Sequence, residues 1–141
     1  MRKPVIAAIN GAVAGMAVPI ALACDLRFMN ENAGLLFSAR KVTGDEAARM
    51  GLVNRSLPAD GVVGAARDYI VDLAANCSPT SIAIIKRQVY VDLHRGLGAA
   101  CDEAEQLMVE SFGRPDFAEG VRSILARRDP DFARIGDVGD E

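Results

Sequence analysis

The stretch KPVIAAINGAVAGMAVPIALACDLRF, residues 3–28, decides the fold that the sequence predicts. Its residues 4–9 form a short apolar run with β-branched side chains, which is typical of a buried strand. The Asn-Gly pair at residues 10–11 interrupts this run, because both residue types tolerate the positive φ of a tight turn. A small-residue segment then leads into an apolar helix over residues 16–23, and residues 25–28 open a second strand. The stretch therefore predicts the order strand, turn, helix, strand.

This order leaves free backbone N–H groups above the turn. The first N–H groups of a helix have no partner inside the helix, and they carry a partial positive charge. Such a terminus suits an anion, or a carbonyl oxygen that becomes an oxyanion. The same pattern also fits an ordinary buried helix between two strands, in which small residues serve close packing. Geometry alone leaves both interpretations open.

The amino-acid sequence of this stretch resembles that of the crotonase superfamily, which comprises the enoyl-CoA hydratases and isomerases. In that family a strand reading KPVIAAxNG leads into a Gly-rich turn, an oxyanion-binding helix start and ACDLR. The resemblance continues in LLFSARKVTGDEAARMGLVNRSLP, residues 35–58, and in RPDFAEGVRSILARRDPDF, residues 114–132. It implies an α/β fold with a partial crotonase-like ββα core over residues 1–58. A C-terminal helical region, residues 59–141, would then pack on this core and contribute to trimer contacts.

The resemblance also implies a ligand, the thioester of an acyl-CoA, whose carbonyl oxygen the family polarises between two backbone N–H groups. It places the second of these N–H groups at Met16, where the family usually has glycine, beside the flexible Gly15. It places Arg127 near the nucleotide end of coenzyme A, although a solvated cation at a helix end explains this arginine equally well. Gly15, Met16 and Arg127 are the predicted substrate-binding residues. No metal is implied, and no cofactor beyond the coenzyme A of the substrate.

Several catalytic elements of the family are expected to be missing. Pro19 stands where hydratases place their first catalytic glutamate, and proline cannot transfer protons. The second glutamate belongs to a segment that the family carries before the 35–58 motif, whereas Gly34 here runs directly into Leu35. The first N–H donor belongs to an N-terminal half that does not precede Met1. We therefore expect little or no hydratase turnover, because general acid–base catalysis needs positioned carboxylates.

Three functions are compatible with this sequence. The first is an enoyl-CoA hydratase/isomerase family protein of fatty acid metabolism that binds acyl-CoA thioesters and is impaired as a hydratase. The second is a non-catalytic acyl-CoA binder or assembly partner, as a homo-oligomer of the trimer type or together with full-length relatives. The third is a fragment without an independent function.

Composition excludes several other classes. The net charge of −3 and a pI of about 5.2 give no electrostatic case for nucleic acid. The three cysteines lack the spacing of a disulfide framework or a zinc site, and free thiols fit a cytoplasmic location. An export signal with a lipid-accepting Cys24 is disfavoured by Pro4 and the Asn-Gly pair. The apolar run over residues 12–24 falls short of the roughly 18 residues of a membrane span.

Local signals set the remaining elements. Residues 35–37 resume apolar character and are expected to end a helix. Thr43 and Glu46 match a capping box, which predicts a short helix that stops at Gly51. A strand is expected over residues 52–57. Apolar spacing then predicts successive helices, one of them capped at Ser78-Pro79. The last helix starts at Asp116, and its apolar residues are expected to face inward: Phe117, Val121, Ile124 and Leu125. Helix faces of this kind fit either an assembly surface or a self-contained bundle.

Overall fold

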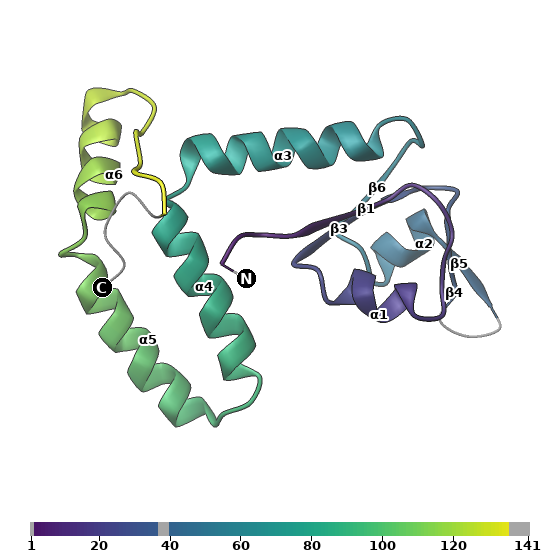
Figure 1. Cartoon of the computed structure of the whole chain (residues 1–141), viewed down its shortest axis with the longest axis horizontal. Coiled ribbons are helices and arrows are strands. Elements are labelled where there is room, and N and C mark those ends of the chain that lie inside the picture. Colours follow the sequence, from purple (N-terminus) through teal and green to yellow (C-terminus); the bar gives the residue numbers. More distant parts are fainter. Residues whose placement is uncertain (1, 37–39, 136–141) are drawn as a thin grey trace. The chain divides into compact units, whose positions relative to one another are not determined.

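The computed structural model describes residues 2–36 and 40–135 of the chain (Figure 1). Its contacts group the chain into two compact units. Pro4–Val71 forms the first, here called the sheet unit, and the chain from Asp72 onward forms the second, the helical unit, together with residues 2–3. The predicted division after residue 58 follows the change from strands to helices, whereas this grouping follows contacts.

A parallel three-stranded sheet forms the centre of the sheet unit. Its strands are β1 (Ile6–Ile9), β3 (Leu26–Asn30) and β6 (Arg55–Leu57), in the order β1-β3-β6. The helices α1 (Ala17–Leu22) and α2 (Gly44–Arg49) lie on the connections between these strands (Figure 1). The predicted order of strand, turn, helix and strand is confirmed, and so is the strand before Pro58, which is shorter than expected.

A second, smaller sheet was not predicted. It consists of β2 (Val13–Ala14), β4 (Gly34–Leu36) and β5 (Lys41–Thr43), with β2 parallel and β5 antiparallel to β4. The expected helix end at residues 35–37 is therefore wrong for Leu35 and Leu36, while Phe37 lies outside the described residues. The reason is burial: Leu35 pairs with Val13 across the sheet and is only 1% exposed.

The tight turn also lies elsewhere than expected. Asn10 and Gly11 do not have positive φ, whereas Gly15, just before α1, has a φ of +54°. The carbonyl oxygen of Asn10 instead accepts a hydrogen bond from the side-chain amide of Asn30 at 3.4 Å. The chain thus leaves β1 in a conformation open to any residue, and the left-handed position falls next to Met16.

The Thr43 half of the predicted capping box of α2 is confirmed, while the printed partner of the Glu46 carboxylate is the guanidinium of Arg40, which donates to it at 2.6 Å. Thr43 is the N-cap residue, and its hydroxyl accepts the N–H of Glu46 at 3.3 Å. At the other end Gly51 has a φ of +77°, which glycine adopts without strain. The helix is therefore bounded by the residues that the sequence marked.

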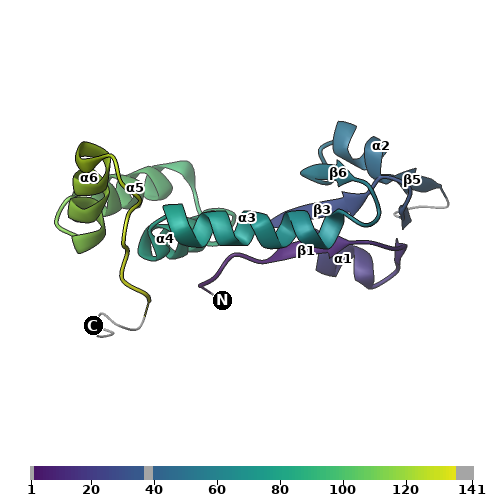
Figure 2. The ribbon, with the colours of Figure 1, turned by 90° about the horizontal axis from the view of Figure 1, so that it is seen from above.

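Two apolar clusters form the interior of the sheet unit. One joins the small sheet, α1 and α2 to the parallel sheet, and its members include Val13, Val18, Ala21, Met29, Leu35, Val42, Ala47 and Val53. The other lies between β3 and the first half of α3 (Val62–Asn76), where Phe28 packs on Val62 and Ala66. The ring of Tyr69 meets Phe28 edge-on at 5.7 Å. Figure 2 shows these first turns of α3 alongside β1 and β3.

The helical unit contains α4 (Pro79–Asp92), α5 (Leu97–Ser111) and α6 (Pro115–Ala126). The predicted cap of α4 is confirmed, since the Ser78 hydroxyl accepts the N–H of Ser81 at 3.0 Å. Arg87 on α4 forms an ion pair with Glu103 on α5 at 2.5 Å. None of the described helices is both long enough and apolar enough to cross a bilayer.

The apolar faces of these helices are open. Neither α4 nor α5 contains a buried residue. The expectation that α6 turns its apolar residues inward is wrong, because Ile124 is 77% and Leu125 80% exposed. Phe117 and Val121 are also exposed. The buried apolar side chains of the described chain all lie between Ile9 and Ala66, so a self-contained helical bundle does not fit.

We expect Gly44→Ala to destabilise the protein by roughly 2–3 kcal/mol, because a Cβ at this position would overlap the carbonyl of Asn30, 2.8 Å from its carbon. Gly64→Ala in α3 is the matched control. A Cβ there meets nothing within 4 Å, so alanine should stabilise the helix by about 0.5–1 kcal/mol. Denaturant unfolding of both variants measures the difference, and equal effects of the two substitutions would contradict the close contact.

Candidate functional site

The turn into α1 presents a free backbone donor. Met16 is the N-cap residue, with φ −62° and ψ −20°, directly after the left-handed Gly15. The next hydrogen bond of the turn runs from the N–H of Val18 to the carbonyl oxygen of Gly15 at 3.1 Å. Within the described part of the chain the Met16 N–H donates no hydrogen bond. The structure thus brings the predicted residues Gly15 and Met16 together, with one donor available.

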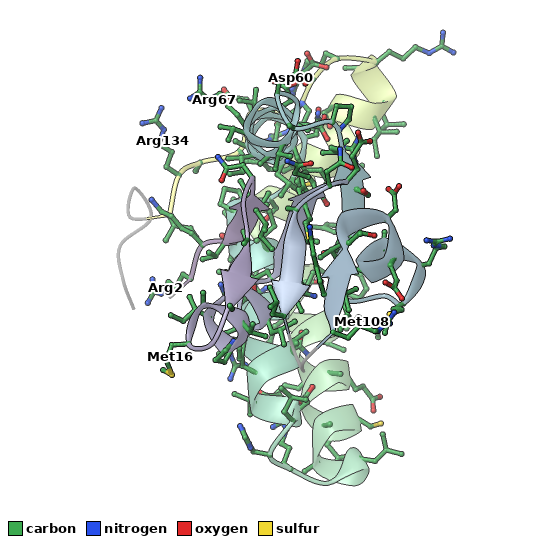
Figure 3. All side chains as sticks on the ribbon, turned by 90° about the vertical axis from the view of Figure 1, so that its right-hand side faces the viewer. Arg2, Met16, Asp60, Arg67, Met108 and Arg134 are labelled. Atoms are coloured by element: carbon green, nitrogen blue, oxygen red, sulfur yellow. The ribbon has the colours of Figure 1, made fainter. Side chains whose placement is uncertain are left out.

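The surroundings of this donor are open and apolar. The Met16 side chain is 78% exposed and points away from the strands (Figure 3). One turn further along α1, Ile20 is also exposed. Pro19 lies in the first turn of the helix, as predicted, where its missing N–H has no intrahelical partner. No residue of α1 is titratable, so the helix itself offers no group for proton transfer.

Two polar side chains of the ACDLR motif hold the other end of α1. The Arg27 guanidinium donates from Nη1 to the carbonyl oxygens of Leu22 at 3.1 Å and Cys24 at 2.7 Å. Its Nε donates to the carbonyl oxygen of Leu52 at 2.7 Å. Asp25 accepts the N–H of Val5 at 2.7 Å. A cation at the carbonyl end of a helix is favourable, and these bonds tie α1 to β1 and to the segment before β6.

Arg127 lies in the helical unit, at the end of α6. It adopts the left-handed conformation, with φ 51° and ψ 46°. Its N–H donates to Ile124 at 3.2 Å, and the N–H of Arg128 donates to Ser123 at 3.1 Å. This is the Schellman pattern of a helix C-terminus, in which glycine usually takes the left-handed position. The Arg127 side chain is exposed, and among the described residues its guanidinium has no ion-pair partner.

Glu119 on α6 accepts hydrogen bonds from two neighbouring arginines, Arg122 and Arg128. Only 8% exposed, it accepts a forked pair of hydrogen bonds from Arg128, at 2.6 and 3.1 Å. The backbone N–H of Asp131 donates to it at 2.9 Å, and Arg122 at 3.2 Å. The hydrogen bonds from Arg128 and then from Asp131 lower the pKa of Glu119 to about 2. Sequence reasoning missed this residue, although it stands inside the quoted motif of residues 114–132.

Within residues 2–36 and 40–135, no group of three His, Cys, Asp or Glu side chains is arranged so that it could hold a metal ion. The single histidine, His94, lies in the turn after α4 and is exposed.

The model of the family enoyl-CoA hydratase/isomerase matches residues 34–134. This chain belongs to that family. The matched span includes α2 to α6, and therefore Glu119 and Arg127. The stretch at residues 3–28 lies before it.

Individual relatives extend the match into that stretch. The chain is 26% identical to the short-chain-enoyl-CoA hydratase of Clostridium acetobutylicum, over 80% of this chain and 53% of the relative. It is 26% identical to the 2,3-dehydroadipyl-CoA hydratase of Escherichia coli, over 93% of this chain and 63% of the relative. The second alignment extends over 165 residues, more than the 141 of this chain. This relative therefore carries extra residues within the aligned span.

Solved structures confirm the predicted fold of this family. A probable enoyl-CoA hydratase/isomerase from Mycobacterium abscessus matches with a TM-score of 0.88 and 26% identity, covering 94% of this chain and 64% of that chain. A putative enoyl-CoA hydratase/isomerase family protein from Hyphomonas neptunium matches with a TM-score of 0.80 and 29% identity, covering 94% and 62%. The chain spans between about half and two thirds of the length of these proteins.

The carboxylate of Glu119 should make the stability of the chain depend on pH. Its pKa lies at about 2 in the folded chain, against an ordinary value of 4.5. A lowered pKa means that the charged form stabilises the fold above pH 4.5 and that this contribution disappears as the pH falls toward 2. We expect Glu119→Gln to flatten the loss of Tm over this range. Glu105→Gln, an exposed carboxylate on α5, is the control and should leave the slope unchanged.

Proposed function

We propose that this protein binds the thioester end of an acyl-CoA at the turn into α1, with the Met16 N–H donating to the thioester carbonyl oxygen. The observation that carries this proposal is the Met16 N–H beside the left-handed Gly15, which has no acceptor in the part of the chain that the structure describes. A donor that is already fixed before the ligand arrives stabilises an oxyanion without reorganisation. The exposed Met16 and Ile20 side chains give an acyl chain an apolar surface beside it.

Family membership supports an acyl-CoA ester as the substrate class that we propose. The relatives named above are hydratases of CoA esters, and a further relative, 25% identical, is a dienoyl-CoA isomerase of Arabidopsis thaliana. We therefore place the protein in fatty acid or related acyl-CoA metabolism. Three free cysteines support a cytoplasmic location, because disulfides belong to oxidising compartments.

The turn into α1 offers a donor that can polarise the thioester carbonyl. It does not offer the groups that hydration of an enoyl-CoA would need. A hydratase must also move protons, and Pro19 occupies the position at which the family's glutamate is expected. We propose thioester binding with oxyanion stabilisation and weak or absent hydratase turnover.

Arg127 is proposed to contact the phosphates at the nucleotide end of coenzyme A. Its exposed guanidinium has no partner among the described residues, and arginine suits phosphate because its planar fork donates two parallel hydrogen bonds. Met16 and Arg127 belong to different units. Each contact is therefore proposed, and tested, by itself.

A second candidate function is assembly. The absence of buried residues from α4 and α5 favours it, together with the exposed apolar side chains Ile85, Val89, Leu93, Leu97, Met108 and Phe112. Exposed apolar surface of this kind marks interaction sites. Such a protein would form homo-oligomers of the trimer type, or join full-length relatives, with or without bound acyl-CoA. Light scattering after size-exclusion chromatography distinguishes a defined oligomer from a monomer or from aggregation.

Thermal unfolding with and without a medium-chain acyl-CoA tests the proposal. A ligand at 100 times its Kd stabilises a folded protein by about 2.7 kcal/mol, so a cooperative transition should move upward by several degrees. An unmoved cooperative transition would leave only the assembly function. The lack of a cooperative transition would remove both, and would favour a chain that does not fold alone.

Replacing Met16 tests the donor directly. Met16→Pro removes the N–H while keeping a φ that the native residue already has, −62°. We expect about tenfold weaker binding of an acyl thioester, the value of one hydrogen bond of roughly 1.4 kcal/mol. Met16→Ala keeps the N–H and removes only the apolar side chain, so it is the matched control and should bind more tightly than Met16→Pro.

An infrared measurement on the unchanged chain complements these variants. A thioester carbonyl that accepts the Met16 N–H should show a lowered C=O stretching frequency when bound. An unshifted carbonyl band in the complex, or equal binding by Met16→Pro and Met16→Ala, would contradict the role of Met16.

A further inference from the structure

The left-handed conformation of Arg127 calls for a physical explanation. Among the described residues it is the one non-glycine with positive φ. A side chain in this conformation is strained by contact of its Cβ with the backbone, and glycine would remove the strain. No ion pair or side-chain hydrogen bond in the described chain compensates for it at Arg127 itself. The backbone hydrogen bonds of the Schellman turn hold Arg127 in this conformation, and non-glycine residues kept in the left-handed region cluster at functional sites.

The next residue shows how the conformation is held. Arg128 turns back onto α6, where both of its Nη atoms bind Glu119. The same carboxylate receives the N–H of Asp131, so it fixes the backbone on the far side of the turn as well. Arg128, Asp131 and Arg122 together donate four hydrogen bonds to the two Glu119 oxygens, which fills the acceptor sites of the carboxylate without Arg127. One arginine of the pair is tethered, and the other has no side-chain partner among residues 2–36 and 40–135.

We infer that Glu119 is a positioning residue, which holds Arg128 against α6 so that the strained Arg127 presents an unpaired guanidinium to the phosphates of the ligand. This inference rests on the proposed contact between Arg127 and the nucleotide end of coenzyme A. Glu119 does not touch the ligand and acts through Arg128 and the turn. The ligand chemistry is a phosphate monoester or diphosphate on an adenosine.

A double-mutant cycle on the full chain tests this role, with adenosine 3′,5′-bisphosphate as the probe and calorimetry as the readout. Arg127→Gln should weaken binding about five- to tenfold, as expected for one charged contact. Glu119→Gln should weaken it about threefold or more when Arg127 is present, and should have no further effect in the Arg127→Gln background. A merely structural role would lower the affinity equally in both backgrounds, which would overturn the inference.

Two further variants keep the test decisive. Arg122→Gln removes the exposed third partner of Glu119, leaves the fork with Arg128 intact and should bind like the unchanged chain. Arg128→Lys keeps the charge but loses the fork, and it replaces Glu119→Gln if that variant does not fold. It should also weaken binding only when Arg127 is present. An effect of Arg122→Gln as large as that of Glu119→Gln would overturn the positioning role.

Arg127→Gly separates stability from binding. Glycine should relieve the strain and raise Tm by roughly 2–5 °C while it weakens probe binding as Arg127→Gln does. Unchanged binding by both Arg127 variants, or no binding by the unchanged chain, would refute the proposed contact itself and the inference with it. A binding loss in the Arg127 variants without one in Glu119→Gln would refute the inference alone.

Discussion

Three carbonyl oxygens converge on the guanidinium of Arg27, and the candidate site at the opposite end of α1 depends on this contact. A helix of six residues has no stability of its own, because nucleation outweighs its few hydrogen bonds. α1 therefore keeps its place through contacts with the rest of the sheet unit. Val18 and Ala21 are buried on one face, and Arg27 binds the last turn. The direction of the Met16 N–H follows from where these contacts hold the helix.

Several elements were predictable because their signals are local. The apolar run at β1, the capping box at Thr43 and the serine-proline start of α4 each specify a backbone conformation with a few adjacent residues. Hydrogen bonds at Thr43 and Ser78 then appear as the side-chain chemistry requires. The family resemblance rested on longer motifs, and the family model and the solved structures agree with it.

The features that the sequence did not predict depend on contacts between residues that are far apart in the sequence. β2 and β4 are only two and three residues long, and their pairing is set by the burial of Leu35 rather than by any strand signal of their own. Apolar spacing on α6 indicated which face is apolar but not what covers it, so the exposure of Ile124 and Leu125 was unforeseen. Nothing in the sequence singled out Glu119, since its three donors come from α6 and from the segment that follows it.

The position of the buried apolar residues has a consequence for biosynthesis. Those among the described residues all lie between Ile9 and Ala66, within a sheet unit that ends at Val71. The ribosome delivers these residues before α4, α5 and α6, and domains generally fold as units during synthesis. The core can therefore close while the helices are still being made. The parallel strand pairs join distant residues, such as Phe28 with Arg55, and form slowly, whereas helices form fast. Because the sheet unit is synthesised before the helices, its slowly forming strand pairs have additional time to fold.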